Sequence, residues 1–172
     1  PAGFVKTLKD PSVNWLFETE PSWGTNGRSI AAPRGKTLGG SSSINGLVFK
    51  RGQSMDFDTW AQRGNQGWGY ADILPYFKRY ETRLGNGSPV YRGQAGEQVI
   101  TDLEWRHPLC DAFIQAATDM GIPLNEDYNG VIQEGISYVQ RTSKGRLRHS
   151  AAKSFLNPVK SRKNLHIITH AH

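Results

Sequence analysis

The chain has 172 residues, of which 37% are hydrophobic, and a formal net charge of +6 at pH 7. That length fits one domain of usual size, the apolar content is low for a self-contained globule, and no apolar run approaches the roughly eighteen residues of a membrane span or the core of a signal peptide. The single cysteine, Cys110, excludes an internal disulfide and suits a reducing compartment, so we expect a cytoplasmic location.

The first half of the chain predicts an irregular start, a loop and two helices. Residues 1–32 scatter aromatic residues among Pro, Gly and Ser without a helical or strand period, which indicates an irregular covering segment. Residues 56–64 predict a short helix that ends at its glycine. Apolar residues then recur at helical spacing from Ile73 to Leu84, with Pro75 expected in the first turn.

The second half predicts alternating strands and helices. A cluster of Gly, Asn and Pro at 85–89 marks the boundary between the halves. Beyond it we expect, in chain order, a strand at 98–102, a helix at 108–121, a strand at 136–142, a short helix at 150–156 and a strand at 165–170.

Positive charge is concentrated at the end of the chain. Residues 141–172 contain eight Lys and Arg residues and no Asp or Glu. Such a segment suits nucleic acid, an anionic cofactor or an acidic partner. A nucleic-acid module usually interleaves aromatic residues with its cations, and this segment offers only Phe155. A basic nucleic-acid-binding module therefore remains the alternative rather than the first interpretation.

The loop at 33–46 carries the clearest chemical signal. Glycines and three consecutive serines follow Arg34 and Lys36, so the backbone can turn tightly and offer N–H groups and hydroxyls to an anion such as a diphosphate. The apolar residues 47–49 follow directly, so a flat apolar ligand could lie beside the same loop. This combination suits a flavin nucleotide, although an ordinary Gly/Ser surface loop has the same composition.

Three other motifs are weaker. Gly35-Lys36-Thr37 lacks the earlier glycine of a nucleoside triphosphatase loop, because position 30 is isoleucine. The Ser150–Lys153 pattern lacks the companion motifs of serine acylases. Three histidines share one face of the last predicted strand, but no Cys, Asp or Glu in the last thirty residues completes a zinc site, so we expect no metal; these histidines are His166, His170 and His172.

Two long segments, PRGKTLGGSSSINGLVFKRG and DFDTWAQRGNQGWGYADILPYFKRYE, resemble the glucose-methanol-choline (GMC) oxidoreductase family of flavoproteins. The family's first signature runs through Gly39-Gly40-Ser41-Ser42, and the resemblance continues through 126–130, 133–135 and 146–158. It covers essentially the whole chain and is greatest to the choline dehydrogenase-like and alcohol dehydrogenase-like branch. The family's opening G-x-G-x-x-G fingerprint and its closing catalytic histidine pair are both missing. The resemblance therefore implies an internal fragment of a larger flavoenzyme.

The resemblance also implies a fold and a cofactor site. The fold would mix α/β and α+β elements: an FAD-binding domain segment at 1–93, part of an inserted substrate-binding domain at 94–156, and a return strand of the FAD-binding domain at 157–172. The residues expected to contact FAD are Thr37, Leu38, Gly39, Gly40, Ser41, Ser42, Asn45, Gly46, Leu47 and Val48. Some family members join the flavin through a histidine just before the asparagine, where this chain has Ile44, so the FAD should be non-covalent.

The implied reaction is oxidation of a small-molecule alcohol, with a base removing the hydroxyl proton while hydride passes to flavin N5. That base would lie beyond residue 172, so no catalytic residue is expected in this chain and the chain alone should show no turnover. Its expected partners are the alcohol substrate and the remainder of its own polypeptide, without nucleic acid or a membrane span.

Overall fold

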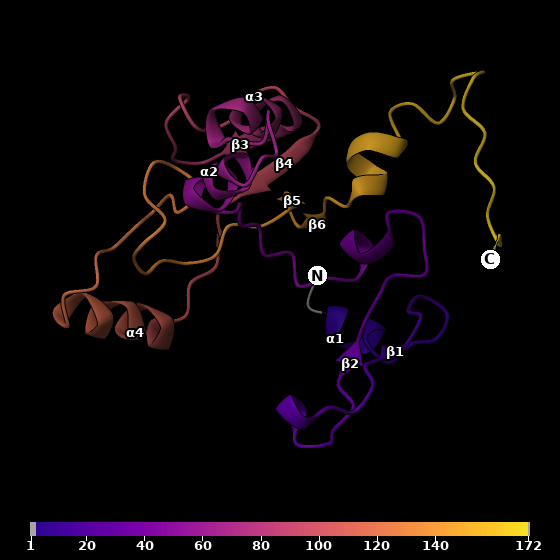
Figure 1. The fold of residues 1–172 in the computed structure, drawn as a ribbon, viewed down its shortest axis with the longest axis horizontal. Coiled ribbons are helices and arrows are strands. Elements are labelled where there is room, and N and C mark those ends of the chain that lie inside the picture. Colours follow the sequence, from indigo (N-terminus) through magenta and orange to yellow (C-terminus); the bar gives the residue numbers. More distant parts are fainter. Residues whose placement is uncertain (1–2, 172) are drawn as a thin grey trace. The chain divides into compact units, whose positions relative to one another are not determined.

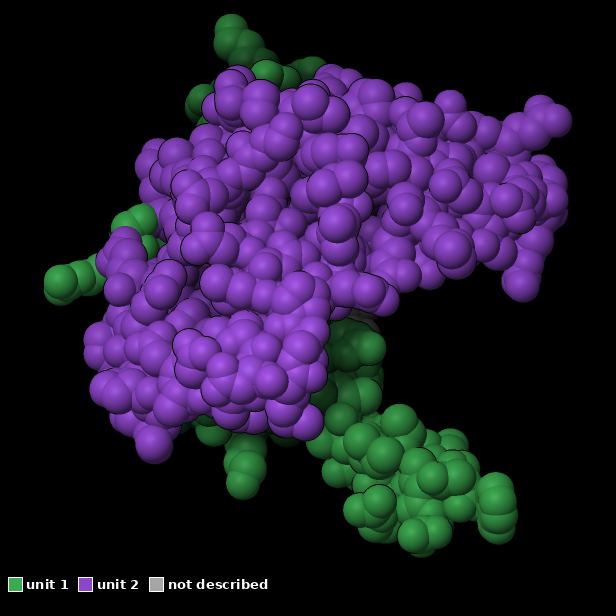
Figure 2. Space-filling model, turned by 90° about the vertical axis from the view of Figure 1, so that its left-hand side faces the viewer, with its two compact units in different colours: residues 1–47, 145–172 green, residues 48–144 purple. Residues whose placement is uncertain are grey.

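The computed structural model describes residues 3–171, which form two compact units. Unit 1 comprises Pro1–Leu47 and Gly145–His172, and unit 2 comprises Val48–Lys144 (Figure 2). The helices and strands along the chain are labelled in Figure 1. Their mixture of helix and strand confirms the expected mixed α and β content.

Unit 1 begins with short elements, as the irregular composition of residues 1–32 predicts. They are α1 (Phe4–Thr7), β1 (Phe17–Glu18), a 3₁₀ turn (Trp23–Thr25) and β2 (Ala31–Ala32). β1 pairs with β2 in antiparallel register. Hydrogen bonds of the Asn14 side chain hold these segments together in place of a longer β-ladder. Asn14 is 2% exposed; its amide donates to the Leu8 carbonyl at 2.8 Å, and its Oδ1 accepts the backbone N–H of Arg34 at 2.9 Å.

The rest of unit 1 contains a 3₁₀ turn (Gly40–Ser43), β6 (Leu147–Arg148) and a π-helix (Ala152–Leu156). The π-helix confirms the short helix expected at 150–156. The strand predicted at 165–170 is wrong, because within residues 3–171 this stretch has no hydrogen-bonded partner strand. β-branched side chains favour an extended backbone, but a strand also needs a neighbour to satisfy its N–H and C=O groups.

Unit 2 contains α2 (Ser54–Gln62), α3 (Tyr70–Tyr80), β3 (Glu81–Leu84), β4 (Gln98–Thr101), α4 (Pro108–Asp119) and β5 (Ser143–Lys144). β3 and β4 are parallel, with Glu81 opposite Gln98. α2 packs on α3 through aromatic rings, and the ring centroids of Phe57 and Phe77 lie 5.7 Å apart. α2, β4 and α4 confirm the helices and strand predicted there, and Gly64, with φ of 95°, follows α2 as expected.

α3 differs from its predicted bounds. It starts at Tyr70, so Pro75 lies in the interior of the helix rather than in its first turn, and it ends at Tyr80. The residues from Glu81 to Leu84 leave the helical path and form β3. Pairing with β4 and burial of Glu81, which is 0% exposed, outweigh the helical periodicity that extends to Leu84.

The strand predicted at 136–142 is also wrong. This stretch makes only isolated bridges, such as that between Arg141 and Thr101, whose reciprocal N–H to O distances are 2.8 and 2.9 Å. A side chain takes the place of a ladder partner at Gln140, because its backbone N–H donates to the Tyr128 hydroxyl at 2.7 Å.

Most of the buried residues are polar or charged. The buried hydrophobic residues are Ile44, Leu47, Val99, Ile100 and Ala117. The buried polar and charged residues are Asn14, Arg51, Glu81, Arg83, Arg92, Gln98, Asn129, Gln140, Ser143, Ser150 and Ser154. Polar contacts therefore hold much of the described chain together. No helix in residues 3–171 has the length and apolar character of a membrane span.

The domain boundaries expected at 93/94 and 156/157 remain predictions. The two compact units divide the chain elsewhere, at 47/48 and 144/145. The β3–β4 pair joins residues on the two sides of the expected 93/94 boundary within unit 2.

Candidate functional site

The Gly/Ser-rich loop of unit 1, residues 33–47, is the candidate site. Its first half is anchored by a bridge between Asn14 and Gly35 and by the Lys36 N–H, which donates to the Val13 carbonyl at 2.7 Å. Gly35 lies against the opposite side of the same loop. A Cβ at this position would be 2.2 Å from the carbonyl oxygen of Gly40, so only glycine fits.

The loop reverses at two successive glycines. Gly39 and Gly40 have φ of 89° and 53°, in the left-handed region that favours glycine. The Gly40 N–H closes the turn on the Thr37 carbonyl at 2.8 Å, and the 3₁₀ turn at Gly40–Ser43 follows at once. The sequence Gly-Gly thus produces a tight turn that ends in a helical turn.

The serine hydroxyls mostly stabilise the loop itself. Ser42 Oγ donates to the Gly39 carbonyl at 2.5 Å and accepts the Ala151 N–H at 2.9 Å. Ser43 Oγ donates to the Leu38 carbonyl at 2.9 Å, and Ser41 Oγ accepts the Gly35 N–H at 3.1 Å. The expectation that the serines offer hydroxyls to an anion therefore needs correction: the hydroxyls of Ser42 and Ser43 already donate within unit 1.

Backbone N–H groups are the donors that remain. Within residues 3–171, those of Thr37, Leu38, Gly39 and Ser41 have no hydrogen-bond acceptor. Thr37, Leu38 and Ser41 are exposed and Gly39 is half-buried. Unpaired N–H groups in a glycine turn suit an anionic ligand, because a backbone donor carries partial positive charge.

The cations beside the loop have other contacts. Lys36 Nζ lies 4.9 Å from the ring centroid of Trp15, in a cation–π geometry, and Arg34 donates to the Pro33 carbonyl at 2.7 Å. Both residues are exposed.

Arg148 contacts the second half of the loop. Its Nη1 donates to Asn45 Oδ1 at 2.7 Å and to the Ser42 carbonyl at 3.1 Å, and its Nη2 donates to the Asn45 carbonyl at 2.6 Å. Burial lowers the pKa of the Arg148 guanidinium. Sequence reasoning missed this residue, because more than one hundred positions separate it from its partners.

All residues predicted to contact FAD lie in this loop, except Val48. Thr37, Leu38, Ser41, Asn45 and Gly46 are exposed, and Gly39, Gly40 and Ser42 are half-buried. Leu47 is buried, at 3% exposed, and its N–H already donates to Asn45 Oδ1 at 3.1 Å. Val48 is 57% exposed and belongs to unit 2.

Unit 2 contains a buried charge cluster that sequence reasoning also missed. Glu81 lies between two arginines: its Oε1 accepts Arg92 Nε at 2.7 Å, and its Oε2 accepts Arg51 Nη2. Glu81 is 0% exposed, Arg92 1% and Arg51 5%. A buried carboxylate with two guanidinium partners is stabilised by charge-assisted hydrogen bonds. No local pattern predicts the cluster, because its members lie far apart in the chain.

A second carboxylate and two amide side chains complete the cluster. Arg92 Nη1 donates to Asp127 Oδ1 and, at 3.0 Å, to Gln140 Oε1. Asn129 donates to the same Gln140 oxygen at 2.8 Å and accepts the Arg51 backbone N–H at 2.7 Å. These contacts join three stretches of unit 2, at 51, 81–92 and 127–140. Burial raises the pKa of the nearby Tyr128 hydroxyl, which donates to the Phe49 carbonyl at 2.9 Å.

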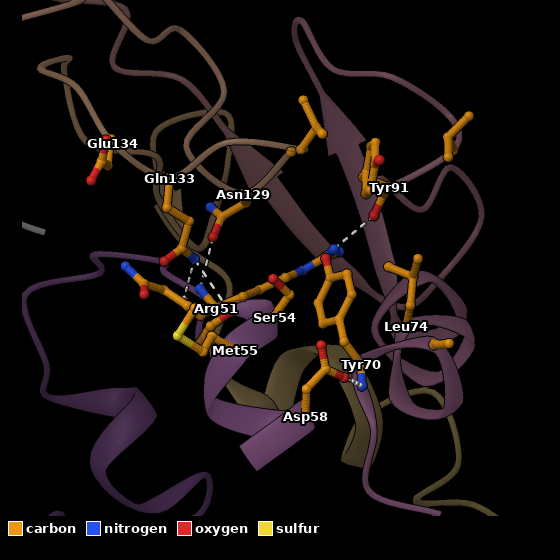
Figure 3. Close-up of a pocket in the computed structure, with 16 residues that line it drawn as sticks. Arg51, Ser54, Met55, Asp58, Tyr70, Leu74, Tyr91, Asn129, Gln133 and Glu134 are labelled. Carbon is orange, nitrogen blue, oxygen red and sulfur yellow. Dashed lines mark hydrogen bonds between the residues drawn. The ribbon is translucent and has the colours of Figure 1, made fainter. Parts of the chain in front are cut away.

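A pocket of about 690 Å³ lies beside this cluster in unit 2 (Figure 3). The Arg51 side chain passes the Tyr70 ring and donates to the Tyr91 carbonyl at 2.6 Å. Gln133 donates to the Arg51 carbonyl at 2.8 Å, and Asp58 accepts the Tyr70 N–H at 2.8 Å. These hydrogen bonds connect the walls of the pocket to one another.

No metal centre appears in the described part of the chain, where no group of three or more His, Cys, Asp or Glu has ligating geometry. The zinc site considered for three histidines includes His172, which lies outside the described residues.

Comparison with known proteins identifies relatives over nearly the whole chain. A family model described as GMC oxidoreductase matches residues 5–172. An oxygen-dependent choline dehydrogenase of Brucella anthropi is 42% identical over 168 residues, which cover 98% of this chain and 30% of the relative. The chain thus spans about a third or less of the length of the curated relatives that it matches.

Solved structures agree with the sequence comparison. The crystal structure of pyridoxine 4-oxidase from Mesorbium loti matches with a TM-score of 0.91 and 31% identity, covering 98% of this chain and 33% of that one. An FAD-dependent oxidoreductase from Chaetomium thermophilum matches with a TM-score of 0.82 and 25% identity, covering 93% of this chain and 30% of that one.

Proposed function

Because the chain belongs to the GMC oxidoreductase family, we propose that it supplies the FAD-contacting loop of a longer, choline dehydrogenase-like flavoenzyme. The observation that carries the proposal is the double-glycine turn at Gly39–Gly40, with its unpaired N–H groups, inside the family match. A diphosphate is the part of FAD that such donors suit. The proposed contacts are Thr37, Leu38, Gly39, Gly40, Ser41, Ser42, Asn45, Gly46, Leu47 and Val48.

The fit of the loop to this cofactor rests on its backbone. Gly35 and Gly40 are in close contact, so the turn is held in one shape before any ligand arrives. Pre-organised donors spend little free energy on ordering when they bind. Ser42 and Ser43 support this shape through their bonds within unit 1.

We further propose that the FAD is bound without a covalent link. The position before Asn45 is Ile44, an aliphatic side chain that is 3% exposed and has no nucleophilic atom. Acid precipitation of the intact enzyme should therefore release the yellow colour into the supernatant. Colour that stays with the precipitated protein would contradict a non-covalent site.

The proposed reaction is oxidation of a small alcohol, for which bound FAD supplies the hydride acceptor. The role of this chain is to bind and orient that cofactor. We assign the catalytic base to polypeptide outside these residues and name no catalytic residue here. The relative from Brucella anthropi, named a choline dehydrogenase, supports an alcohol as the substrate class.

The family match disfavours the nucleic-acid alternative. It rested on the charge of residues 141–172, and the family match includes that segment. Arg148, one of its cations, makes contacts inside unit 1.

A glycine substitution tests the proposal in the intact enzyme. Gly39→Ala adds a Cβ that would lie 2.6 Å from Ser43 Oγ, at φ of 89°, and should remove most of the bound FAD. Gly121→Ala is the matched control, because Gly121 has φ of 90° with no atom within 4 Å of an added Cβ and lies in unit 2. Equal FAD content in wild type and Gly39→Ala, or equal loss in both variants, would contradict the proposal.

A further inference from the structure

We propose that Arg148 is a positioning residue for the cofactor loop, which sets the orientation of the Asn45 side-chain amide. This inference rests on the proposed function and adds to it a residue outside the Gly/Ser segment. The supporting contacts all lie in unit 1.

The guanidinium of Arg148 makes three hydrogen bonds to the loop. It donates to the Ser42 carbonyl at 3.1 Å, to the Asn45 carbonyl at 2.6 Å and to Asn45 Oδ1 at 2.7 Å. The Ser42 and Asn45 carbonyls lie at the end of the 3₁₀ turn, where the chain leaves Gly40–Ser43. Arg148 therefore caps this turn with a charged, two-pronged donor, which a single backbone bond could not replace.

The same contacts decide which way the Asn45 amide faces. Its Oδ1 accepts from two donors, Arg148 Nη1 at 2.7 Å and the Leu47 N–H at 3.1 Å. A flipped amide would place its NH₂ group against both of these donors, which is unfavourable. The oxygen is thus held toward Arg148 and Leu47.

The amide nitrogen is left as a donor. Asn45 is exposed, and within residues 3–171 its Nδ2 has no hydrogen-bond acceptor. Apolar residues begin two positions further on, at Leu47. A bound flavin offers acceptor atoms on the polar edge of its ring system, and a pre-oriented NH₂ group suits such an acceptor. Arg148 then acts on the cofactor through Asn45 without contacting it.

Substitutions at both positions in the intact enzyme test the coupling. Arg148→Gln removes the positive charge and the bidentate hydrogen bonding of the guanidinium, and Asn45→Ala removes the side-chain amide. Each should weaken FAD binding about tenfold to a hundredfold. This is the effect expected for loss of a hydrogen bond made by a charged group, or of a hydrogen bond that such a group orients. FAD affinity is measured by titrating the apoenzyme and following flavin fluorescence. Arg146→Gln is the matched control, because Arg146 is a nearby exposed arginine without a hydrogen bond or ion pair in the described chain.

The double variant Arg148→Gln/Asn45→Ala separates positioning from general support of the loop. If Arg148 acts through Asn45, the double variant binds FAD about as well as the weaker single variant. Arg148→Lys retains the charge and loses the bidentate hydrogen bonding, so it should shift the visible absorption spectrum of the bound flavin. This variant replaces Arg148→Gln in the test if Arg148→Gln does not fold.

Losses of FAD affinity that add up in the double variant would overturn the inference. So would Arg148→Gln and Arg148→Lys proteins with the FAD affinity and absorption spectrum of the wild type. Either result leaves the proposed function intact when the wild type binds FAD. A wild-type enzyme that binds no FAD would overturn the proposed function, and this inference with it.

Discussion

Gly35 shows how one residue fixes the candidate site. Its backbone lies so close to Gly40 that a Cβ would be 2.2 Å from the carbonyl oxygen and 2.7 Å from the Ser41 nitrogen. Both atoms belong to the backbone and cannot rotate away. The need for glycine at position 35 therefore comes from the chain that faces it rather than from its own dihedral angles.

We predict that Gly35→Ala opens the loop and costs about 1 to 3 kcal/mol of unfolding free energy in the intact enzyme, as overpacking typically does. FAD content should fall with it. Gly24→Ala is the control, because no atom lies within 4 Å of a Cβ at that position. Denaturant unfolding and FAD content check both effects, and a Gly35→Ala protein equal to wild type in both would contradict the structure of the loop.

A second residue-scale prediction concerns Glu81. This carboxylate faces both Arg51 and Arg92 and is 0% exposed. Glu81→Gln leaves two buried guanidinium groups without their shared counter-charge, and such a loss costs about 3 to 5 kcal/mol. Glu97→Gln, at an exposed position next to β4, should change the unfolding free energy little. Denaturant midpoints for the two variants that coincide would refute the assigned role of Glu81.

Residue chemistry was only partly predictable from sequence. Composition located the loop, because consecutive glycines and serines carry their conformational preferences wherever they occur. Arg148 and Glu81 were missed because their contacts join distant positions: Glu81 meets Arg51 thirty residues away, and Arg148 meets Asn45 across 103. No local pattern carries that information.

At the scale of elements, the helices were easier to predict than the strands. The periodicity and breakers that define α2 and α4 lie within each helix, whereas a strand depends on a partner elsewhere. Residues 136–142 alternate in the expected way, but the Tyr128 hydroxyl takes the Gln140 N–H. α3 ends early for a similar reason, since Glu81 joins the β3–β4 pair.

α4 provides a prediction about its first turn. His107 Nδ1 accepts the Leu109 N–H at 3.2 Å and so caps the helix. Loss of a side-chain cap costs about 1 kcal/mol, so His107→Ala should speed hydrogen exchange of the first amides of α4. Asn is a strong cap, so His107→Asn should restore slow exchange. Both variants lose the ring contact with Trp105, so any difference between them reports the cap. Identical exchange in the two variants would contradict the cap.

Most of the large apolar side chains of α4 are exposed in the structure. Leu109 is 74% exposed, Phe113 71% and Met120 82%, whereas Ala117 is buried at 8%. In Figure 1, α4 is drawn away from α2, α3 and the β3–β4 pair of the same unit. An amphipathic pattern predicts that a helix has an apolar face, but it does not identify what covers that face.

At the scale of the molecule, the described chain buries few apolar side chains. Trp23 is 95% exposed and Ile168 80%, and the buried set is rich in Arg, Ser, Asn and Gln. Hydrophobic burial is the main favourable contribution to folding, so 172 residues with this pattern have a weak driving force.

We therefore predict that residues 1–172 in isolation are poorly soluble or partly molten. They should bind a hydrophobic dye and unfold over a broad temperature range, in contrast to the intact enzyme. A sharp, cooperative thermal transition with well-dispersed amide resonances for the isolated chain would contradict this prediction.

The flavin content of the intact enzyme tests the proposed cofactor loop most directly. The purified protein is scanned for visible absorption, and its FAD is released by acid and quantified against protein. We predict the blue absorption of oxidised flavin and close to one FAD per polypeptide. A colourless protein that also fails to take up added FAD would show that residues 33–47 do not form a cofactor loop.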